Sequence, residues 1–98
     1  MYCHSFYMSM KKIVLDGKYL CNRDVAHTYL QEALELPDYY GKNLDALYDL
    51  LTSLPETVEI DLAYKDQMLE QLGAYSTSLL LTLQQAEEDA PNLILNIL

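Results

Sequence analysis

Apolar residues recur along this chain in short runs, and the spacing of these runs predicts alternating strands and helices. Residues 13–15 form an apolar run that ends at Asp16-Gly17, a turn signal, which indicates a buried strand. Over residues 58–62 apolar residues alternate with acidic ones, as is typical of a strand. The nearly all-apolar residues 93–98, which follow Pro91-Asn92, predict a third strand.

Four helices are predicted between these strands, over residues 22–36, 43–53, 65–72 and 76–89. Asn22 is a good N-cap residue for the first helix, and Pro37 ends it because proline cannot continue a helix. The expected core stripe of this helix is Val25, Tyr29, Leu30, Ala33 and Leu34. The second helix has Leu44, Leu47 and Leu51 at the i, i+3, i+7 spacing of a core stripe.

The predicted order of elements is β-α-α-β-α-α-β. Strands joined by helical crossovers pair in parallel, so the fold class is α/β, with a three-stranded parallel sheet covered by about four helices. Ninety-eight residues suffice for one domain, which we place at residues 10–98. Residues 1–9 have neither apolar periodicity nor the features of a secretory signal, so we expect a disordered N-terminal extension there.

The charge of the chain is acidic and unevenly distributed. The net charge is −9, from 15 acids and 6 bases. Up to Lys42 five acids are balanced by five bases, whereas the 56 residues from Asn43 onward contain ten acids and one base, Lys65. Such a field repels nucleic acid and anionic membranes and attracts a basic protein, although acidity alone also serves solubility. The longest apolar runs are too short to cross a membrane.

Few residues favour catalysis or metal binding. Three glycines leave no phosphate-binding loop, and no serine or cysteine has the surroundings of a nucleophile. The two cysteines and two histidines do not have the spacing of a zinc site, so we expect no metal, no cofactor and no enzymatic activity. Cys21 is expected to be at least half-buried, and His27 to be exposed on the first helix without a function.

One cluster of residues is not explained by folding alone. Asp45 and Asp49 lie four residues apart on the second helix, where like charges repel each other and aspartate is a poor helix former. Asp49 is also too far from the helix N-terminus to be stabilised by the helix dipole. The adjoining positions add Tyr39, Tyr40, Gly41, Asn43, Tyr48 and Thr52. Aromatic rings beside carboxylates are typical of protein-binding surfaces, so the set predicts a binding patch, although Tyr40 alone is more typical of a residue that plugs the core.

Residues 36–49, LPDYYGKNLDALYD, closely resemble the signature of the barstar family, LPxYYGxNLDALWD. The predicted order of elements is also similar to that of this family, and the likeness extends over residues 10–98, although only residues 36–49 are highly specific. The resemblance implies a cytoplasmic inhibitor that plugs the active site of a basic, secreted, barnase-like ribonuclease. It further implies a chain that is monomeric when free and forms a 1:1 complex with its partner.

The resemblance also implies roles for individual residues. Asp49 would occupy the place of a substrate phosphate among the arginines and the catalytic histidine of the nuclease, and Asp45 would pair with a further basic side chain. Tyr39 would pack against the catalytic histidine. Asn43 and the backbone of Gly41 would contribute hydrogen bonds.

The chain departs from the family pattern on the expected binding surface. Tyr48 and Leu54 stand where the family has tryptophan, and Lys42 stands where barstar has an acid. A partner-binding glutamate late in the fourth helix corresponds to Gln85, with Glu88 one turn on as a substitute. These differences leave open an alternative function, that of a barstar-like immunity or regulatory protein for a different basic toxin or nuclease.

Overall fold

The structure, a computed structural model, describes residues 11–98, so the extension expected at residues 1–9 lies outside the described residues. Three strands, β1 (Lys11–Asp16), β2 (Val58–Ala63) and β3 (Leu93–Ile97), form one sheet in the order β1-β2-β3. Both neighbouring pairs are parallel, with Ile60 opposite Ile13 on one side and opposite Leu95 on the other. The predicted three-stranded parallel sheet is therefore confirmed.

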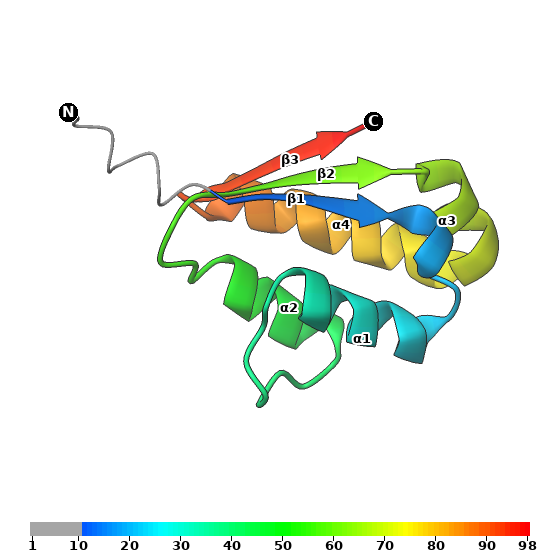
Figure 1. The fold of residues 1–98 in the computed structure, drawn as a ribbon, viewed down its shortest axis with the longest axis horizontal. Helices are drawn as coiled ribbons and strands as arrows, with labels where there is room; N and C mark the ends of the chain where they lie inside the picture. The colour runs from blue at the N-terminus through cyan, green and yellow to red at the C-terminus, as the bar shows by residue number, and fades with distance from the viewer. Residues whose placement is uncertain (1–10) are drawn as a thin grey trace.

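The helices are α1 (Arg23–Ala33), α2 (Leu44–Leu51), α3 (Lys65–Leu72) and α4 (Ala74–Asp89), and a 3-10 turn, η2 (Gly17–Tyr19), follows β1. Helices α1, α2 and α4 lie on the same side of the sheet, and α3 lies near the end where β1 and β2 finish (Figure 1). The chain crosses the sheet in one direction, and right-handed crossovers made in one direction place their helices on one face. Within residues 11–98 the other face carries no helix.

The core lies between the sheet and this layer of helices. The predicted stripe of α2 is confirmed, because Leu47 and Leu51 are fully buried and Leu44 is half-buried. The strands and the other helices contribute further buried residues, among them Leu15, Leu30, Ile60, Leu62, Leu79 and Leu83. Burial of these side chains supplies the main favourable free energy of folding.

The predicted turn at Asp16-Gly17 is also confirmed, and it brings η2 against the end of β2. A Cβ atom on Gly17 would lie 2.2 Å from the carbonyl oxygen of Tyr64, so a residue with a side chain does not fit at this approach. Helix α4 begins at Ala74, two residues before the predicted start, directly after Gly73. The chain therefore passes from α3 to α4 through a single residue.

The inward face of α1 differs from the prediction. Val25 is 43% exposed and Tyr29 is only partly buried, whereas Ala26 and His27 are buried. The hydroxyl of Tyr29 accepts a hydrogen bond from the backbone N–H of Asp16 at 2.9 Å, which holds this amphipathic ring at the edge of the core. Leu30 and Leu34 of the predicted stripe are buried and Tyr29 and Ala33 pack against the core, so the prediction is wrong only at Val25.

The end of α1 also differs from the prediction. The helix stops at Ala33 and not at residue 36, because Glu35 adopts a left-handed conformation with φ 54°. The Glu35 carboxylate accepts a hydrogen bond from Lys11 Nζ at 2.9 Å, which ties this turn to the start of β1. The chain then enters the loop that leads to α2.

Candidate protein-binding site

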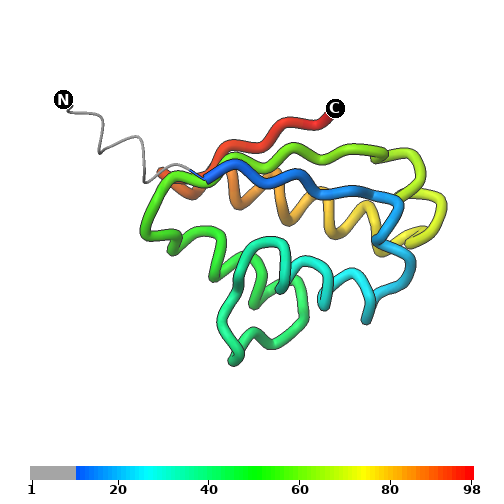
Figure 2. The backbone as a smooth tube through the Cα atoms, in the orientation of Figure 1, coloured from blue at the N-terminus to red at the C-terminus, as the bar shows by residue number. Residues whose placement is uncertain are grey.

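The loop between α1 and α2 projects from the layer of helices on the side away from the sheet (Figure 2). Asn43 is the N-cap of α2: its Oδ1 accepts from the N–H of Ala46 at 2.8 Å, and its Nδ2 donates to the carbonyl of Gly41 at 3.2 Å. Lys42 between them has a left-handed φ of 54°. The side chain of Asn43 therefore shapes the loop, and any role of Asn43 toward a partner stays a proposal.

The two adjacent tyrosines of this loop differ greatly in burial. Tyr39 is 81% exposed, whereas Tyr40 is 5% exposed. The N–H of Tyr40 donates to the carbonyl of Pro37 at 2.9 Å, which closes a turn. Tyr40 thus plugs the core, and Tyr39 forms the aromatic surface of the loop. Beside Tyr39 lies a hollow of about 330 Å³, which Leu54 also lines.

The exposed side of α2 presents Asp45 and Asp49 to solvent. The ion pairs formed within residues 11–98 join Lys11 to Glu35, Lys12 to Asp61 and Lys18 to Asp16. None of these cations reaches α2, so the described part of the chain does not neutralise the two carboxylates. Thr52 ends the helix, and its hydroxyl donates back to the carbonyl of Tyr48 at 2.9 Å.

Helix α4 packs beside α2 and adds a carboxylate that the sequence analysis missed. The hydroxyl of Tyr48 donates to Asp89, and Nε2 of Gln85 donates to the same carboxylate oxygen at 3.2 Å. The bond from Tyr48, and next the bond from Gln85, lower the pKa of Asp89, because both stabilise the charged carboxylate. The hydrogen bond between Tyr48 and Asp89 also raises the pKa of Tyr48, because the carboxylate stabilises the protonated hydroxyl. Glu88 is exposed on α4, but the acid that contacts α2 is Asp89.

A hollow of about 370 Å³ lies between α2 and α4 and is lined by Leu44, Asp45, Tyr48, Leu81, Thr82 and Gln85. Leu81 is 59% exposed at this hollow. Leu81 and Asp89 lie four residues before and after Gln85, so helical spacing around Gln85 would have indicated both. We call the surface made by Asp45, Tyr48, Asp49, Gln85 and Asp89 the acidic face.

His27 contradicts the sequence prediction, because it is 1% exposed and not a surface residue. Its Nδ1 lies 2.5 Å from the hydroxyl of Tyr40, and its Nε2 lies 2.5 Å from the hydroxyl of Tyr75. Burial is the main cause that lowers the pKa of His27, since it disfavours the charged ring. His27 precedes the buried Leu30 and Leu34 by three and seven residues, and this spacing could have placed it on the inward stripe.

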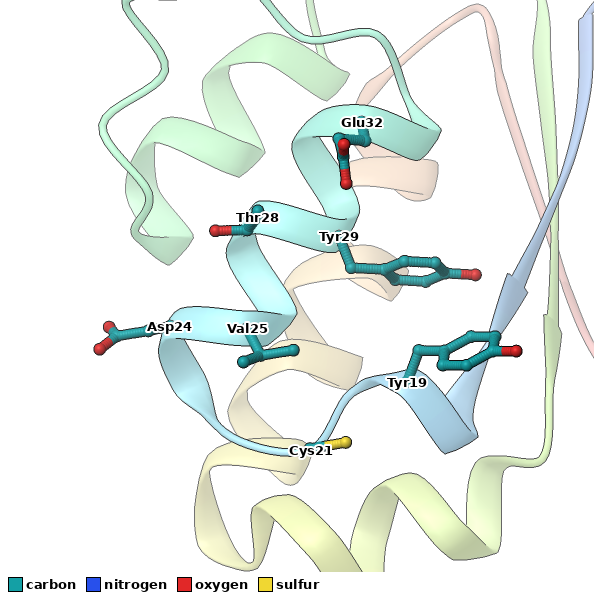
Figure 3. A pocket seen from close by; sticks show the side chains of 7 residues that line it. All are labelled: Tyr19, Cys21, Asp24, Val25, Thr28, Tyr29 and Glu32. Atoms are coloured by element: carbon teal, nitrogen blue, oxygen red, sulfur yellow. The ribbon is translucent and has the colours of Figure 1, made fainter.

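Other parts of the described chain show fewer features of a functional site. Cys21 is exposed, contrary to the prediction, and its thiol donates to the carbonyl of Lys18 at 3.5 Å. No three His, Cys, Asp or Glu side chains within residues 11–98 are arranged to hold a metal ion, and no helix there could cross a membrane. A hollow of about 420 Å³ lies where the ring of Tyr19 meets that of Tyr29 of α1 at a tilt of 50°, with ring centroids 5.7 Å apart (Figure 3). It is lined by none of the residues predicted to bind a partner.

Two comparisons with known proteins bear on this surface. A family described as "Barstar (barnase inhibitor)" matches residues 10–94. The chain belongs to the barstar family. A relative from Bacillus subtilis (strain 168), named "Putative ribonuclease inhibitor YrdF", is 39% identical over 82 residues, which are 82% of this chain and 89% of the relative. The resemblance noted at residues 36–49 is thus confirmed, and the matched region also contains α4 with Gln85 and Asp89.

Proposed function

We propose that this barstar-family protein inhibits a basic, barnase-like ribonuclease by placing the acidic face and Tyr39 in the RNA-binding groove of the enzyme. The observation that carries the proposal is the exposed pair Asp45 and Asp49, which forms no ion pair within residues 11–98. Two like charges at i, i+4 destabilise a helix by a few tenths of a kcal/mol, roughly. Asp45 lies in the first turn of α2, where the helix dipole favours an acid, but folding gives no such reason for Asp49. A partner that brings its own cations does.

The groove of a ribonuclease binds phosphates, so it holds several cations close together. A carboxylate in such a site accepts charge-assisted hydrogen bonds with the same geometry as a phosphate oxygen. Asp49 takes the place of the substrate phosphate in this proposal, and Asp45 pairs with a further basic side chain. Tyr39 covers the catalytic histidine, and the backbone of Gly41 supplies hydrogen bonds. The complex is 1:1, because one groove accepts one loop and helix.

The charge distribution supports a partner of opposite charge. Ten of the 15 acids lie in the last 56 residues, with Lys65 as the one base there. The field of such a surface accelerates the encounter with a basic protein. An inhibitor of a secreted nuclease protects the cell that makes the enzyme, so we place this protein in the cytoplasm.

A different basic nuclease or toxin is the second candidate partner, because the binding surface departs from the family pattern. Tyr48 replaces a tryptophan, and its hydroxyl holds Asp89. Leu54 replaces another tryptophan and lines the hollow beside Tyr39. Gln85 is neutral where the family has a glutamate. These differences change the shape and charge that a nuclease meets, but they retain the pair of aspartates on α2.

Titration of barnase with the purified protein tests the proposal. RNA hydrolysis should fall linearly to zero at one equivalent of inhibitor. A mononucleotide bound in the active site should slow formation of the complex, because both ligands need the same groove. If barnase stays active while another basic secreted ribonuclease is inhibited, the second candidate is correct. Inhibition that the mononucleotide does not slow, or no inhibition of any ribonuclease, contradicts the proposed function.

A further inference from the structure

His27 connects three segments that are far apart in the sequence. From α1 its ring lies between Tyr40, in the loop before α2, and Tyr75, at the start of α4, and each ring nitrogen is 2.5 Å from one hydroxyl. The ring centroids of His27 and each tyrosine are 5.8 Å apart. Every fully buried side-chain nitrogen and oxygen of the described residues has a hydrogen-bond partner. A buried polar cluster that is fully satisfied in this way makes the segments that it joins rigid.

The number of protons in the cluster assigns a direction to both hydrogen bonds. A neutral imidazole has one N–H donor and one acceptor nitrogen. Tyr40 is buried, and within residues 11–98 its hydroxyl bonds only to His27, so a Tyr40 hydroxyl that accepted from His27 would leave its own proton without an acceptor. Tyr75 is partly exposed and can direct its proton to solvent. Tyr40 therefore donates to Nδ1, and the N–H of Nε2 donates to Tyr75.

Tyr40 is the central fixed point of the loop formed by residues 37–43. At one end of the loop, Nε2 of Gln31 donates to the carbonyl of Pro37 at 3.1 Å, and at the other end Asn43 caps α2. Tyr39 and Gly41 are the covalent neighbours of Tyr40, and both are exposed. The hydroxyl of Tyr40 therefore ties the middle of the loop, between two exposed residues, to His27 of α1.

We propose that His27 and Tyr75 are positioning residues for the binding loop: they hold the hydroxyl of Tyr40 and thereby keep Tyr39 and Gly41 where a nuclease meets them. This inference rests on the proposed function for the identity of the partner, but not for the geometry of the loop. His27 is buried and acts through Tyr40 rather than by contact with the nuclease. A loop that is ordered before binding loses less conformational entropy in the complex, so the cluster raises affinity by preorganisation.

Only a neutral His27 fits this cluster, because an imidazolium would donate from both nitrogens and leave the buried tyrosine hydroxyl without an acceptor. Burial first, then Arg23 and Lys42, lower the pKa of His27, and Asp24 opposes them. The folded pKa thus lies below the ordinary value of 6.5. The contribution of His27 to folding is complete above that value and is lost as the pH falls from it toward the folded pKa.

Two matched hydroxyl deletions test the inference. Tyr75→Phe removes the hydroxyl that accepts from His27, and Tyr29→Phe removes a bonded hydroxyl from the same helix as His27. Tyr29 serves as the control because its hydroxyl bonds the N–H of Asp16 and points toward β1 (Figure 3). Tyr75→Phe should speed hydrogen exchange of the Tyr40 amide roughly fivefold or more and leave the Asp16 amide unchanged, as expected for one lost hydrogen bond. Tyr29→Phe should do the reverse.

The ¹⁵N chemical shifts of the His27 ring give a second, independent measurement. Above pH 7 the wild-type protein should show a protonated Nε2 and an unprotonated Nδ1. The opposite tautomer, or equal acceleration of the Tyr40 and Asp16 amides in Tyr75→Phe, overturns the arrangement.

Affinity measurements test whether the positioning of the loop by His27 and Tyr75 matters for binding. For a ribonuclease that the wild type inhibits, Tyr75→Phe should weaken binding several-fold, whereas Tyr29→Phe should not. Unchanged affinity together with a faster Tyr40 amide contradicts the positioning role. If the wild type inhibits neither barnase nor any other ribonuclease, the proposed function fails, and the exchange rates and ring shifts still decide whether His27 holds the loop.

Discussion

Two pairs of acidic residues in this fold have different surroundings. On β2, Glu59 and Asp61 point to the face of the sheet that has no helix, and Nδ2 of Asn96 donates to Glu59 at 2.6 Å and to Asp61 at 2.8 Å. Nζ of Lys12 lies 3.6 Å from the second oxygen of Asp61. Both carboxylates therefore accept a hydrogen bond from their own chain, and Asp61 also has a cation as a partner.

The pair on α2 has the opposite surroundings. Asp45 and Asp49 are exposed, and within residues 11–98 no lysine, arginine or amide approaches them as Asn96 and Lys12 approach the strand pair. Both pairs place like charges on one face of a secondary-structure element, so the sequence pattern alone does not distinguish them. The neighbours do: the strand pair serves the fold, and the helix pair is available to a partner.

Asp49→Ala should give the largest effect on binding. If Asp49 stands in for a phosphate, its removal leaves several cations of the nuclease buried and unpaired, and such central positions cost at least about 2 kcal/mol of binding energy and up to about 8. Stability should stay level or rise slightly, because alanine is the better helix former and the repulsion from Asp45 disappears. Calorimetric titration and urea unfolding of the same variant measure the two quantities. Affinity within threefold of wild type, or a large loss of stability, would place Asp49 with the residues that serve the fold.

Asp61→Ala should show the reverse behaviour. The variant loses an acceptor for Asn96 and the partner of Lys12, so the free energy of unfolding should fall by about 1–2 kcal/mol. Affinity for the nuclease should stay within a factor of about three, because Asp61 alternates along β2 with the core residues Ile60 and Leu62 and so faces away from the helices. The same two measurements apply. A loss of affinity at unchanged stability would show that the strand pair also meets the partner, and the distinction between the pairs would be wrong.

Much of the fold could be predicted because its signals are local. The strand order and the stripe of α2 follow from periodicity and capping residues that lie within a few positions of one another. The inward face of α1 did not follow, since the choice between Val25 and Ala26 depends on what the helix packs against. His27 had the spacing of a core residue, but its partner Tyr75 is 48 residues away.

The candidate site divides in the same way. Residues 36–49 are contiguous, so the loop and α2 could be recognised from the sequence alone. Asp89 joins the site through the packing of α4 on α2, and Tyr48, which binds it, lies 41 residues earlier. Helical spacing around Gln85 could have indicated Asp89 as a candidate, but the sequence does not show which faces of α2 and α4 meet. The part of the site contributed by α4 was therefore incomplete until the structure placed both helices.

If the acidic face steers a basic partner, as proposed, the rate of association should fall as salt is added. Between low and high ionic strength we expect a decrease of roughly tenfold or more. Asp45→Asn should lower the low-salt rate more than Glu59→Gln, although each variant removes one charge, since screening weakens the contribution of the more distant acid. Stopped-flow mixing measures these rates. A rate independent of salt, or equal effects of the two variants, would show that the helix pair has no special place in steering.

Tyr48→Phe should have the smallest effect on binding, because the hydroxyl of Tyr48 donates to Asp89 but leaves the charge of Asp89 in place. Asp89 is intermediate between the strand pair and the helix pair. It has hydrogen-bond partners in its own chain, as the strand pair does, but it keeps its charge on the acidic face, as the helix pair does. The bond from Tyr48 is the first cause of the lowered pKa of Asp89, so Tyr48→Phe should raise that pKa toward the ordinary value of 3.8. The bond from Gln85 remains and should keep the pKa somewhat below this value.

An NMR titration of the Asp89 carboxyl measures the change in its pKa. Tyr39→Phe is the control, since the hydroxyl of Tyr39 lies on the exposed loop and does not bond Asp89. Affinity should change by less than about threefold, because the aromatic ring stays and exposed contacts contribute little. A pKa of Asp89 that does not move would mean that α4 offers its carboxylate to a partner without any hold from α2.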